Sequence, residues 1–374
     1  MKIIQYLHTT EGGHRQYVMV LAEALARLED VVLVTARNAP ESMSVRQLAV
    51  LNAPDPLKQG LGRIVNRLRV YWGQPRDFEG AARAEIKAPG VDICHFQELP
   101  SLFPSRIVSR ARKIGYLTII TIHNISPHET TGLIAKLRQI GLVRAWRNAD
   151  LLLVHSSNLV KELVETSDVS PSKVAVARHP IWPAALGTDM RSPDGYLFFG
   201  HLREGKGLPD FIQSLSLLGN PRASIVGSGT AQAVEQVRHE LESLHLTNCT
   251  FDPRFVSDAE VPAIFAQHQI LVAPYTHFVA QSGVTHLAAT YGLATVVTAV
   301  GALPDLIEEY GVGEVAGFEP GSLATAMSRA HSRACKGEYD VGLARARTEL
   351  SSDAIAQKLV ELYQGCSEMK QEDD

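Results

Sequence analysis

Short apolar runs of four to six residues alternate along the chain with longer segments of helical periodicity. Runs of this length that are apolar on both faces are typical of strands in a parallel sheet covered by helices. In the first half the predicted strands are KIIQYL, DVVLVT, DICHF, LTIITI and DLLLVH. Residues 17–28 have helical spacing and join the first two, so this half is predicted to be a doubly wound α/β domain.

The second half repeats the same plan. Its predicted strands are GYLFFG, RASIVG, CTFDP, ILVAPY and ATVVTAV, and helical patterns cover 208–218 and 231–244. Between the halves, residues 178–183 and 187–195 are rich in Pro, Gly, Asp and Ser, which is typical of a linker. The pattern therefore predicts an α/β chain with two Rossmann-like domains that face each other across a cleft.

A last helix is predicted over 353–364, with Ile355, Leu359 and Tyr363 in its apolar stripe, and the polar tail EMKQEDD is expected to fray. The predicted domains are 1–183 and 184–350, followed by 351–374 as a helix that packs back on the first domain.

Composition adds one asymmetry to this picture. The chain has 374 residues, 45% of them hydrophobic, which suits two globular domains. Its formal net charge of -4 argues against a nucleic-acid partner. Residues 54–147, however, hold 15 Lys/Arg and 7 Asp/Glu. This uneven distribution predicts an anionic partner for the first half.

Cysteine usage and hydropathy bear on location. The four cysteines form no CxxC pair, so neither a zinc site nor a disulfide framework is predicted, and a reducing cytoplasm fits. No apolar run is long enough to span a bilayer. Residues 57–76 mix cations with apolar residues and Trp72. This segment could be a basic amphipathic helix on an anionic membrane or an ordinary helix with a cationic solvent face. The expected location is cytoplasmic, with any membrane contact peripheral and on the inner face of the cell membrane.

The segment FFGHLREGKG, residues 198–207, follows a predicted strand and precedes a predicted helix. Gly200 allows a tight turn, and Arg203 and Lys206 come three residues apart just before the helix. A helix N-terminus offers free N–H groups and a positive dipole end. Arg binds phosphate oxygens with two N–H groups, and Lys adds a mobile charge. The segment therefore predicts a diphosphate site, with a solvated surface loop as the alternative.

The segment PYTHFVAQSGV, residues 274–284, also follows a predicted strand. Gln281, Ser282 and Gly283 open a predicted helix, followed by Val284. Gly283 would let the backbone approach a ligand closely, and Ser282 could cap the helix or donate its hydroxyl. A simple helix cap without a ligand is the alternative.

In the first half, TIHNISPHE brings His123, Asn124, His128 and Glu129 to the carboxyl end of a predicted strand. The spacing is not that of a metalloprotease helix, so a hydrogen bond from one histidine to a hydroxyl group of a ligand is favoured over metal binding. For His128, a loop histidine stacked on a neighbour is an equally good interpretation.

Two further groups lie at strand ends. Gly12 and Gly13 follow the first predicted strand and permit a loop close to a ligand, but they lack the full dinucleotide pattern. His95, His155 and His179 also end or follow predicted strands. Each of these three could face the cleft, but structural roles are more typical of such histidines.

Taken together, these segments resemble the retaining, nucleotide-sugar-dependent glycosyltransferases of family 4, which have the GT-B fold. The resemblance covers nearly the whole chain and is strongest over 196–307. Lys206 and Gly207 match the Lys-Gly that closes this loop in many relatives, and Arg203 matches a basic residue of some bacterial members. His201 stands where other members have Arg directly after the glycine.

A bacterial subgroup that builds surface polysaccharides carries PY followed by QSGV, matched here by 274–275 and 281–284. HNISPHE is similar to the HN-x-x-PHE of this subgroup, so His123 is the matching site histidine. Most of the wider family has two glutamates in the second domain that contact the sugar and the ribose. Val279 and Leu287 stand there in this chain, and backbone amides near 281–284 are the candidates to replace them.

The resemblance implies hexosyl transfer from a nucleoside-diphosphate sugar to a saccharide acceptor, lipid-linked, in exopolysaccharide or surface-polysaccharide synthesis, with retention. The implied catalytic residues are His123, Arg203 and Lys206. The implied donor-binding residues are Gly200, Arg203, Lys206, Gln281, Ser282, Gly283 and Val284. The implied acceptor-side or cleft residues are Gly12, Gly13, Asn124, His128 and Glu129.

The implied mechanism needs neither a cofactor nor a metal, because cations and helix amides would stabilise the leaving diphosphate. The expected partners are a nucleotide sugar and a saccharide or polyprenyl-linked acceptor, without nucleic acid. Two other functions remain open at this point. A nucleotide-sugar 2-epimerase would need acid/base carboxylates, for which Glu129 is the clear candidate. A non-catalytic nucleotide-sugar-binding protein would fit the missing glutamates.

Overall fold

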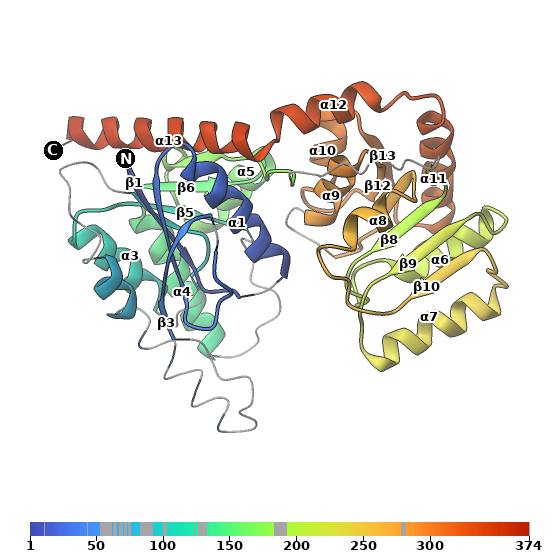
Figure 1. Ribbon diagram of the computed structural model, residues 1–374, viewed down its shortest axis with the longest axis horizontal. Coiled ribbons are helices and arrows are strands. Elements are labelled where there is room, and N and C mark those ends of the chain that lie inside the picture. Colours follow the sequence, from blue (N-terminus) through green and yellow to red (C-terminus); the bar gives the residue numbers. More distant parts are fainter. Residues whose placement is uncertain are drawn as a thin grey trace. The chain divides into compact units, whose positions relative to one another are not determined.

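The computed structural model describes residues 1–10, 12–42, 44–52, 62, 66, 70, 73, 76–82, 93–99, 103–123, 125, 133–182, 193–277 and 282–373. The chain forms two compact units. The first consists of Met1–Pro180 and Ser352–Asp374, and the second of Ile181–Ser351. Each unit has its own parallel sheet with helices packed around it (Figure 1).

The sheet of the first unit has seven strands in the order β3-β2-β1-β4-β5-β6-β7. Its strands are β1 (Lys2–Leu7), β2 (Asp30–Ala36), β3 (Arg46–Leu51), β4 (Ile93–Phe96), β5 (Leu117–Thr121), β6 (Leu151–Val154) and β7 (Val174–Val176). Its helices are α1 (Gly12–Ala26), α3 (Pro104–Lys113), α4 (Leu133–Asn148), α5 (Ser157–Ser167), the 3-10 helix η1 (Pro171–Lys173) and α13 (Ser352–Asp373).

The central strands of this sheet are buried on both faces. Every residue of β4, β5 and β6 is buried, because helices cover the two sides of the sheet. The core includes Tyr6 of β1, Phe96 of β4 and Ile120 of β5. The sequence predicted these strands to within about a residue, because continuous apolar runs are the direct signature of two-sided burial.

Local chemistry sets several helix ends in both units. α5 begins where the hydroxyl of Ser156 accepts a hydrogen bond from the N–H of Leu159 at 3.3 Å. It ends at Asp168, which has a left-handed conformation. In the second unit, Thr230 caps α7 (Ala231–Ser243) in the same way through the N–H of Ala233. Such caps satisfy amides that have no partner inside the helix.

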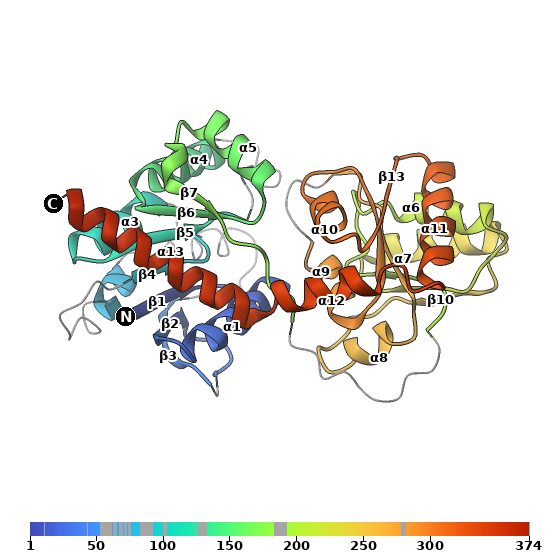
Figure 2. The same cartoon turned by 90° about the horizontal axis from the view of Figure 1, so that it is seen from above.

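The C-terminal helix α13 packs along α1 in the first unit (Figures 1 and 2). Tyr363 of α13 is fully buried, and its hydroxyl lies 2.7 Å from Nδ1 of His95 on β4. Arg27 at the end of α1 pairs with Asp353. The helix continues to Asp373, beyond the end that the sequence pattern predicted at 364 and through the tail that was expected to fray.

The second unit has a six-stranded sheet in the order β10-β9-β8-β11-β12-β13. Its strands are β8 (Tyr196–Phe199), β9 (Ala223–Val226), β10 (Cys249–Asp252), β11 (Ile270–Ala273), β12 (Ala294–Thr298) and β13 (Gly313–Ala316). Its helices are α6 (Leu208–Leu217), α7 (Ala231–Ser243), α8 (Val261–Phe265), α9 (Gly283–Tyr291), α10 (Leu303–Tyr310), α11 (Pro320–Ala334) and α12 (Asp340–Glu349).

Three strands were absent from the sequence prediction: β3, β7 and β13. All three lie at the edge of a sheet, where one side has no neighbouring strand. Edge strands bury less surface and can carry polar residues, as Arg46 and Gln47 in β3 and Glu314 in β13 do. In β3 and β13 the apolar pattern is therefore too weak to identify a strand, and β7 has only three residues.

The cysteines and the helices bear on the predictions about disulfides and membrane spans. All four cysteines are free, and Cys94 is buried in β4 as predicted. Among the helices described, none combines the length and the apolar composition needed to cross a membrane. Most of the basic segment 57–76 lies outside the described residues.

Candidate functional site

The loop between β8 and α6 is held by glycines at positions that exclude a side chain. Gly200 and Gly207 have φ angles of +125° and +65°. A Cβ on Gly207 would lie 1.7 Å from the carbonyl oxygen of Pro274, and one on Gly227 would lie 1.8 Å from that of Gly200. Only glycine allows these close backbone approaches and the positive φ angles.

Backbone hydrogen bonds fasten this loop to two neighbouring loops. The N–H of Leu202 donates to the oxygen of Ser228 at 2.7 Å, and the N–H of Thr276 donates to the oxygen of Gly205 at 3.0 Å. The side chain of Val284 at the start of α9 lies against Gly200, 3.9 Å from where its Cβ would be. The fold thus brings residues 198–207 together with 274–277 and 282–284, which belong to two segments that the sequence pattern indicated separately.

Lys206 is the partly buried cation of this loop. Its Nζ lies 3.5 Å from the centroid of the Tyr275 ring, a cation–π contact. Burial lowers the pKa of Lys206 to about 7, and the positive charge of Arg203 acts in the same direction. A cation that is destabilised by dehydration and by a second cation gains charge stability when an anion binds beside it.

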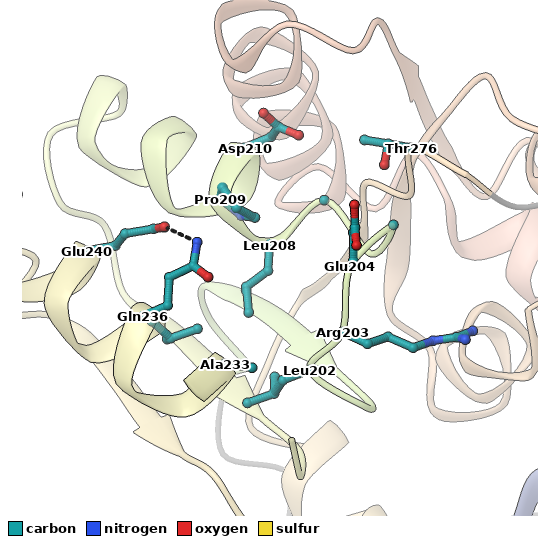
Figure 3. Close-up of a pocket in the computed structure, with 13 residues that line it drawn as sticks. Leu202, Arg203, Glu204, Leu208, Pro209, Asp210, Ala233, Gln236, Glu240 and Thr276 are labelled. Atoms are coloured by element: carbon teal, nitrogen blue, oxygen red, sulfur yellow. Dashed lines mark hydrogen bonds between the residues drawn. The ribbon is translucent and has the colours of Figure 1, made fainter. Parts of the chain in front are cut away.

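Arg203 is exposed at the surface of the second unit. A pocket of about 500 Å³ lies beside this loop, between the start of α6 and helix α7. Figure 3 shows the Arg203 side chain directed away from Gln236 and Glu240 of α7. The pocket is also lined by Glu204 and Asp210, so its charge disfavours a diphosphate. The cations and the start of α9 offer the better anion site.

The start of α9 is organised by Ser282 and Tyr275. The Tyr275 hydroxyl lies 3.1 Å from the hydroxyl of Ser282, and both residues are buried. The Ser282 hydroxyl makes no capping hydrogen bond to the helix, although Ser282 occupies the N-cap position. Of the two roles considered for Ser282, the structure places the residue at the N-cap position, while its hydroxyl lies beside that of Tyr275. Gln281 lies outside the described residues.

One of the two positions that carry a glutamate in most of the wider family lies among the described residues. Leu287 stands where most of the wider family has a glutamate, and it packs against the apolar cluster of Leu271 and Phe265. It contributes to the core rather than to polar recognition. Its counterpart Val279 lies outside the described residues.

In the first unit, Gly12 and Gly13 form the beginning of α1, just after β1. A Cβ on Gly13 would meet no atom within 4 Å, so its surroundings do not require glycine there. The loop that precedes the helix is held by Glu98. The Glu98 carboxylate accepts hydrogen bonds from the N–H groups of His8 and Thr9 and from the Thr9 hydroxyl. Sequence reasoning missed Glu98, which follows β4 without a recognisable motif.

His123 lies in a cluster of aromatic and imidazole rings at the carboxyl ends of β5, β6 and β7. Its ring meets His14 edge to face at 4.6 Å and Tyr17 at 5.1 Å, measured between centroids. His155 and His179 complete the cluster around Tyr17. Sequence reasoning named His123, His155 and His179 individually but missed His14, which enters from the first turn of α1.

Burial favours the neutral form of several histidines here. It lowers the pKa of His155 to about 4, that of His95 to about 3, and that of His123 well below its ordinary value. The other histidines add to the lowering at His123. Burial also lowers the pKa of His14, opposed by the charge of Glu98. Neutral imidazoles can exchange hydrogen bonds with uncharged polar ligands.

Three acceptor-side candidates, Asn124, His128 and Glu129, lie outside the described residues. Among the residues that the structure does describe, no group of three or more His, Cys, Asp or Glu side chains is arranged to hold a metal ion.

Comparisons with known proteins agree with this arrangement. Residues 12–178 match the family described as Glycosyl transferase 4-like domain, and residues 193–333 match Glycosyl transferases group 1. The search of curated protein sequences gave no match. The two family matches together span most of the chain and follow the two structural units.

Solved structures show the same fold at low sequence identity. Sucrose-phosphate synthase from Thermosynechococcus elongatus is 17% identical, with a TM-score of 0.72 over 97% of this chain and 98% of its own. The Anabaena protein HepE, solved with UDP and glucose, is 16% identical, with a TM-score of 0.72 over 97% of this chain and 99% of its own. A glycosyltransferase from Rickettsia africae is 13% identical, with a TM-score of 0.71 over 98% of each chain.

Two parallel α/β units of this kind define the GT-B class of glycosyltransferases, which confirms the predicted fold. This chain is a glycosyltransferase that combines a glycosyl transferase 4-like domain with a glycosyl transferases group 1 domain.

Proposed function

We propose that this enzyme transfers a hexosyl unit from a nucleoside-diphosphate sugar to a saccharide acceptor, with retention at the anomeric carbon. The acceptor is lipid-linked, and the reaction belongs to the synthesis of an exopolysaccharide or surface polysaccharide. The observation that carries the proposal is the position of Arg203 and Lys206 on the glycine-bounded loop 200–207, packed against the start of α9.

The diphosphate of the donor binds to this loop. Its negative charge restores the full charge of Lys206, which burial and Arg203 destabilise in the free protein. The first amides of α9 add N–H groups and a positive dipole end, and the side chain of Ser282 at the N-cap position does not cap them. As the sugar leaves, charge grows on the diphosphate, and these groups stabilise it most when it is greatest. Amides of 282–284 then also replace the missing glutamates in holding the donor.

Because two cations and helix amides neutralise the leaving group, the proposed reaction needs no divalent metal and no cofactor. The HepE structure was solved with UDP and glucose, which supports UDP-sugars as the first donors to test. On the acceptor side, His123 is the proposed sugar contact, with Gly12, Gly13, Asn124, His128 and Glu129 as further candidates.

A lipid-linked acceptor would bring the enzyme to the inner face of the cell membrane, and helices α3 and α4 support this. They pack against each other, and their sequences contain eight Lys/Arg and no Asp/Glu. On α4, Leu137 and Ile140 are 58% and 49% exposed and share a face with Arg144. Exposed apolar side chains among cations suit an anionic bilayer surface, where each cation contributes about 1 kcal/mol.

A thermal-shift screen against UDP, GDP, dTDP and CMP tests the donor site, because a ligand of the folded state raises its melting temperature. One diphosphate nucleotide is expected to stabilise the protein. Arg203→Ala and Lys206→Ala are each expected to weaken its binding roughly 10- to 100-fold, the loss of one charge-assisted hydrogen bond. Lys336→Ala, at a 66% exposed lysine of the same unit, serves as the control. Unchanged affinity in both site variants would refute the phosphate role.

Two further measurements test retention at the anomeric carbon and independence from a divalent metal. Proton NMR of the first product formed from an α-linked donor is expected to show an α-linkage, and activity is expected to survive EDTA. A β-linked first product would contradict retention.

A further inference from the structure

Two histidines of the first unit form a directed chain of hydrogen bonds. Nδ1 of His155 lies 2.8 Å from the backbone oxygen of Ala177, and Nε2 of His155 lies 3.0 Å from Nδ1 of His123. A carbonyl oxygen can only accept a hydrogen bond, so Nδ1 of His155 carries the hydrogen.

The neutrality of both rings fixes the direction of the second bond. Burial lowers the pKa of His155 to about 4 and that of His123 well below its ordinary value. In a neutral imidazole only one nitrogen carries a hydrogen. Nε2 of His155 therefore has none and accepts, while Nδ1 of His123 donates. This leaves Nε2 of His123 as a bare acceptor.

The bare nitrogen is buried. Nε2 of His123 has no hydrogen-bond partner among the residues that the structure describes, and the same holds for Nε2 of His14 beside it. A buried polar atom without a partner is costly and needs an explanation, which a ligand that donates a hydrogen bond would supply. An imidazole lone pair attracts a hydroxyl hydrogen and repels the lone pairs of phosphate or carboxylate oxygens.

We propose that His155 is a positioning residue: it holds His123 in the tautomer with a bare Nε2, which accepts a hydrogen bond from a hydroxyl group of the sugar substrate. The ligand chemistry rests on the proposed function, whereas the tautomer is a property of the free protein. His155 itself touches no substrate in this scheme and acts through His123.

The surrounding groups favour the same state. Those that face the pair or influence it are His14 and Tyr17 from α1, His95 from β4, His179 after β7, and Glu98. The imidazoles oppose a second proton on His123, and burial raises the pKa of Tyr17, which keeps its hydroxyl hydrogen.

Nitrogen-15 NMR of histidine-labelled protein at neutral pH tests the tautomer without any ligand. His123→Gln assigns the His123 signals among the 14 histidines. The expected spectrum shows a protonated Nδ1 and an unprotonated Nε2 on His123. A protonated Nε2 in the unmutated protein would overturn the proposal.

Two variants separate positioning from packing. His155→Phe fills the space but removes the acceptor, and the His123 signals are expected to move to the averaged values of mixed tautomers. His155→Gln can still donate to Ala177 and accept from His123, and it is expected to preserve the single tautomer. An unchanged His123 pattern in a folded His155→Phe protein would contradict the proposal. If the His155→Phe variant does not fold, the spectrum of the unmutated protein still decides which tautomer His123 adopts.

Adding UDP-glucose or UDP alone tests the ligand chemistry. UDP-glucose is expected to shift the Nε2 signal of His123, and UDP alone is expected to leave it in place. Equal shifts with both, or none with bound UDP-glucose, would overturn the hydroxyl contact. A protein that binds no nucleotide in the thermal-shift screen would contradict the proposed function, while the ligand-free spectrum still decides the role of His155.

Discussion

The ammonium group of Lys206 lies 3.5 Å from the centre of the Tyr275 ring, and this contact joins the β8–α6 loop to the segment before α9. The ring partly replaces the water that burial removes from the ammonium. The replacement is incomplete, because the pKa of Lys206 still falls to about 7. In the free enzyme this lysine is therefore charged only part of the time near neutral pH.

We expect nucleotide binding to take up protons above neutral pH. At pH 8 most Lys206 side chains in the free protein are neutral, and a bound diphosphate raises the pKa of Lys206 so that it regains its proton. Binding of UDP, or of whichever nucleotide the screen identifies, should therefore be accompanied by the uptake of ~1 proton per site by the protein at pH 8. Calorimetry in buffers of different ionisation enthalpy measures this number.

Lys206→Met is the matched variant for this measurement, since it keeps the length of the side chain and removes its titration. It should bind more weakly and without the proton uptake. Equal uptake by the variant and the unmutated protein would show that another group titrates.

The same lysine has a consequence for stability. Its folded pKa of about 7 is below its ordinary value of 10.5, so the unfolded chain binds more protons between these values. The unfavourable contribution of Lys206 to folding stability is fully present below about pH 7. It decreases as the pH rises from there toward 10.5, the pKa of lysine in the unfolded chain. Lys206→Met should therefore stabilise the free protein more at pH 6.5 than at pH 9.5, as urea unfolding would show.

Gly207→Ala should damage the donor loop. Its Cβ would lie 1.7 Å from the Pro274 oxygen, at a φ of +65° that alanine disfavours. We expect a loss of more than about 2 kcal/mol in urea unfolding, together with weaker nucleotide binding.

The control is Gly321→Ala in the first turn of α11, where a Cβ would meet nothing within 4 Å. It should change stability by less than about 1 kcal/mol. Similar effects of the two substitutions would show that the backbone contact with Pro274 is unimportant.

Tyr363→Phe should loosen the C-terminal helix from the first unit. The substitution removes the hydroxyl that lies 2.7 Å from His95 Nδ1 in a fully buried site. The weaker contact from Gln97 at 3.4 Å remains. We expect a loss of about 1–3 kcal/mol, the cost of a buried polar group that loses its main partner. Gln364→Ala, at the exposed neighbouring position, should cost less than about 0.5 kcal/mol.

Hydrogen exchange would locate the effect of this substitution. Faster exchange is expected in α13 and in its partner α1. Faster exchange that spares α13 would argue against an anchoring role for Tyr363.

Membrane binding should depend on the apolar face of α4. Leu137→Asp introduces a negative charge at an exposed position among cations. It should strongly reduce flotation with vesicles that contain an anionic lipid, and added salt should weaken binding of the unmutated protein. Leu217→Asp, at a 64% exposed leucine of α6 in the other unit, is the control. Equal recovery from neutral and anionic vesicles would rule out the electrostatic attraction.

Much of the fold could be predicted because its central strands are buried on both faces. The runs that became β1, β4, β5 and β6 are mostly apolar and buried along almost their whole length, so the pattern identifies them without knowledge of their neighbours. The edge strands β3 and β13 could not be predicted, since an edge position tolerates Arg46 and Glu314.

The candidate site divides in the same way. Arg203 and Lys206 could be selected from sequence, because a glycine-bounded loop between a strand and a helix is a local feature. The ring that contacts Lys206 could not, since Tyr275 comes from another strand end. His14 was missed because its approach to His123 depends on how α1 packs on the sheet.

By itself, the sequence determined most of the central elements and the loop that holds the donor-site cations, because spacing and glycine conformation act over a few residues. Only the tertiary structure decided the protonation of Lys206 and the tautomer of His123. Burial and hydrogen bonding control both, and the partners are distant in sequence: His155 is 32 residues from His123, and Tyr363 is 268 from His95. Such pairs are created when strands and helices pack, so no local pattern specifies them.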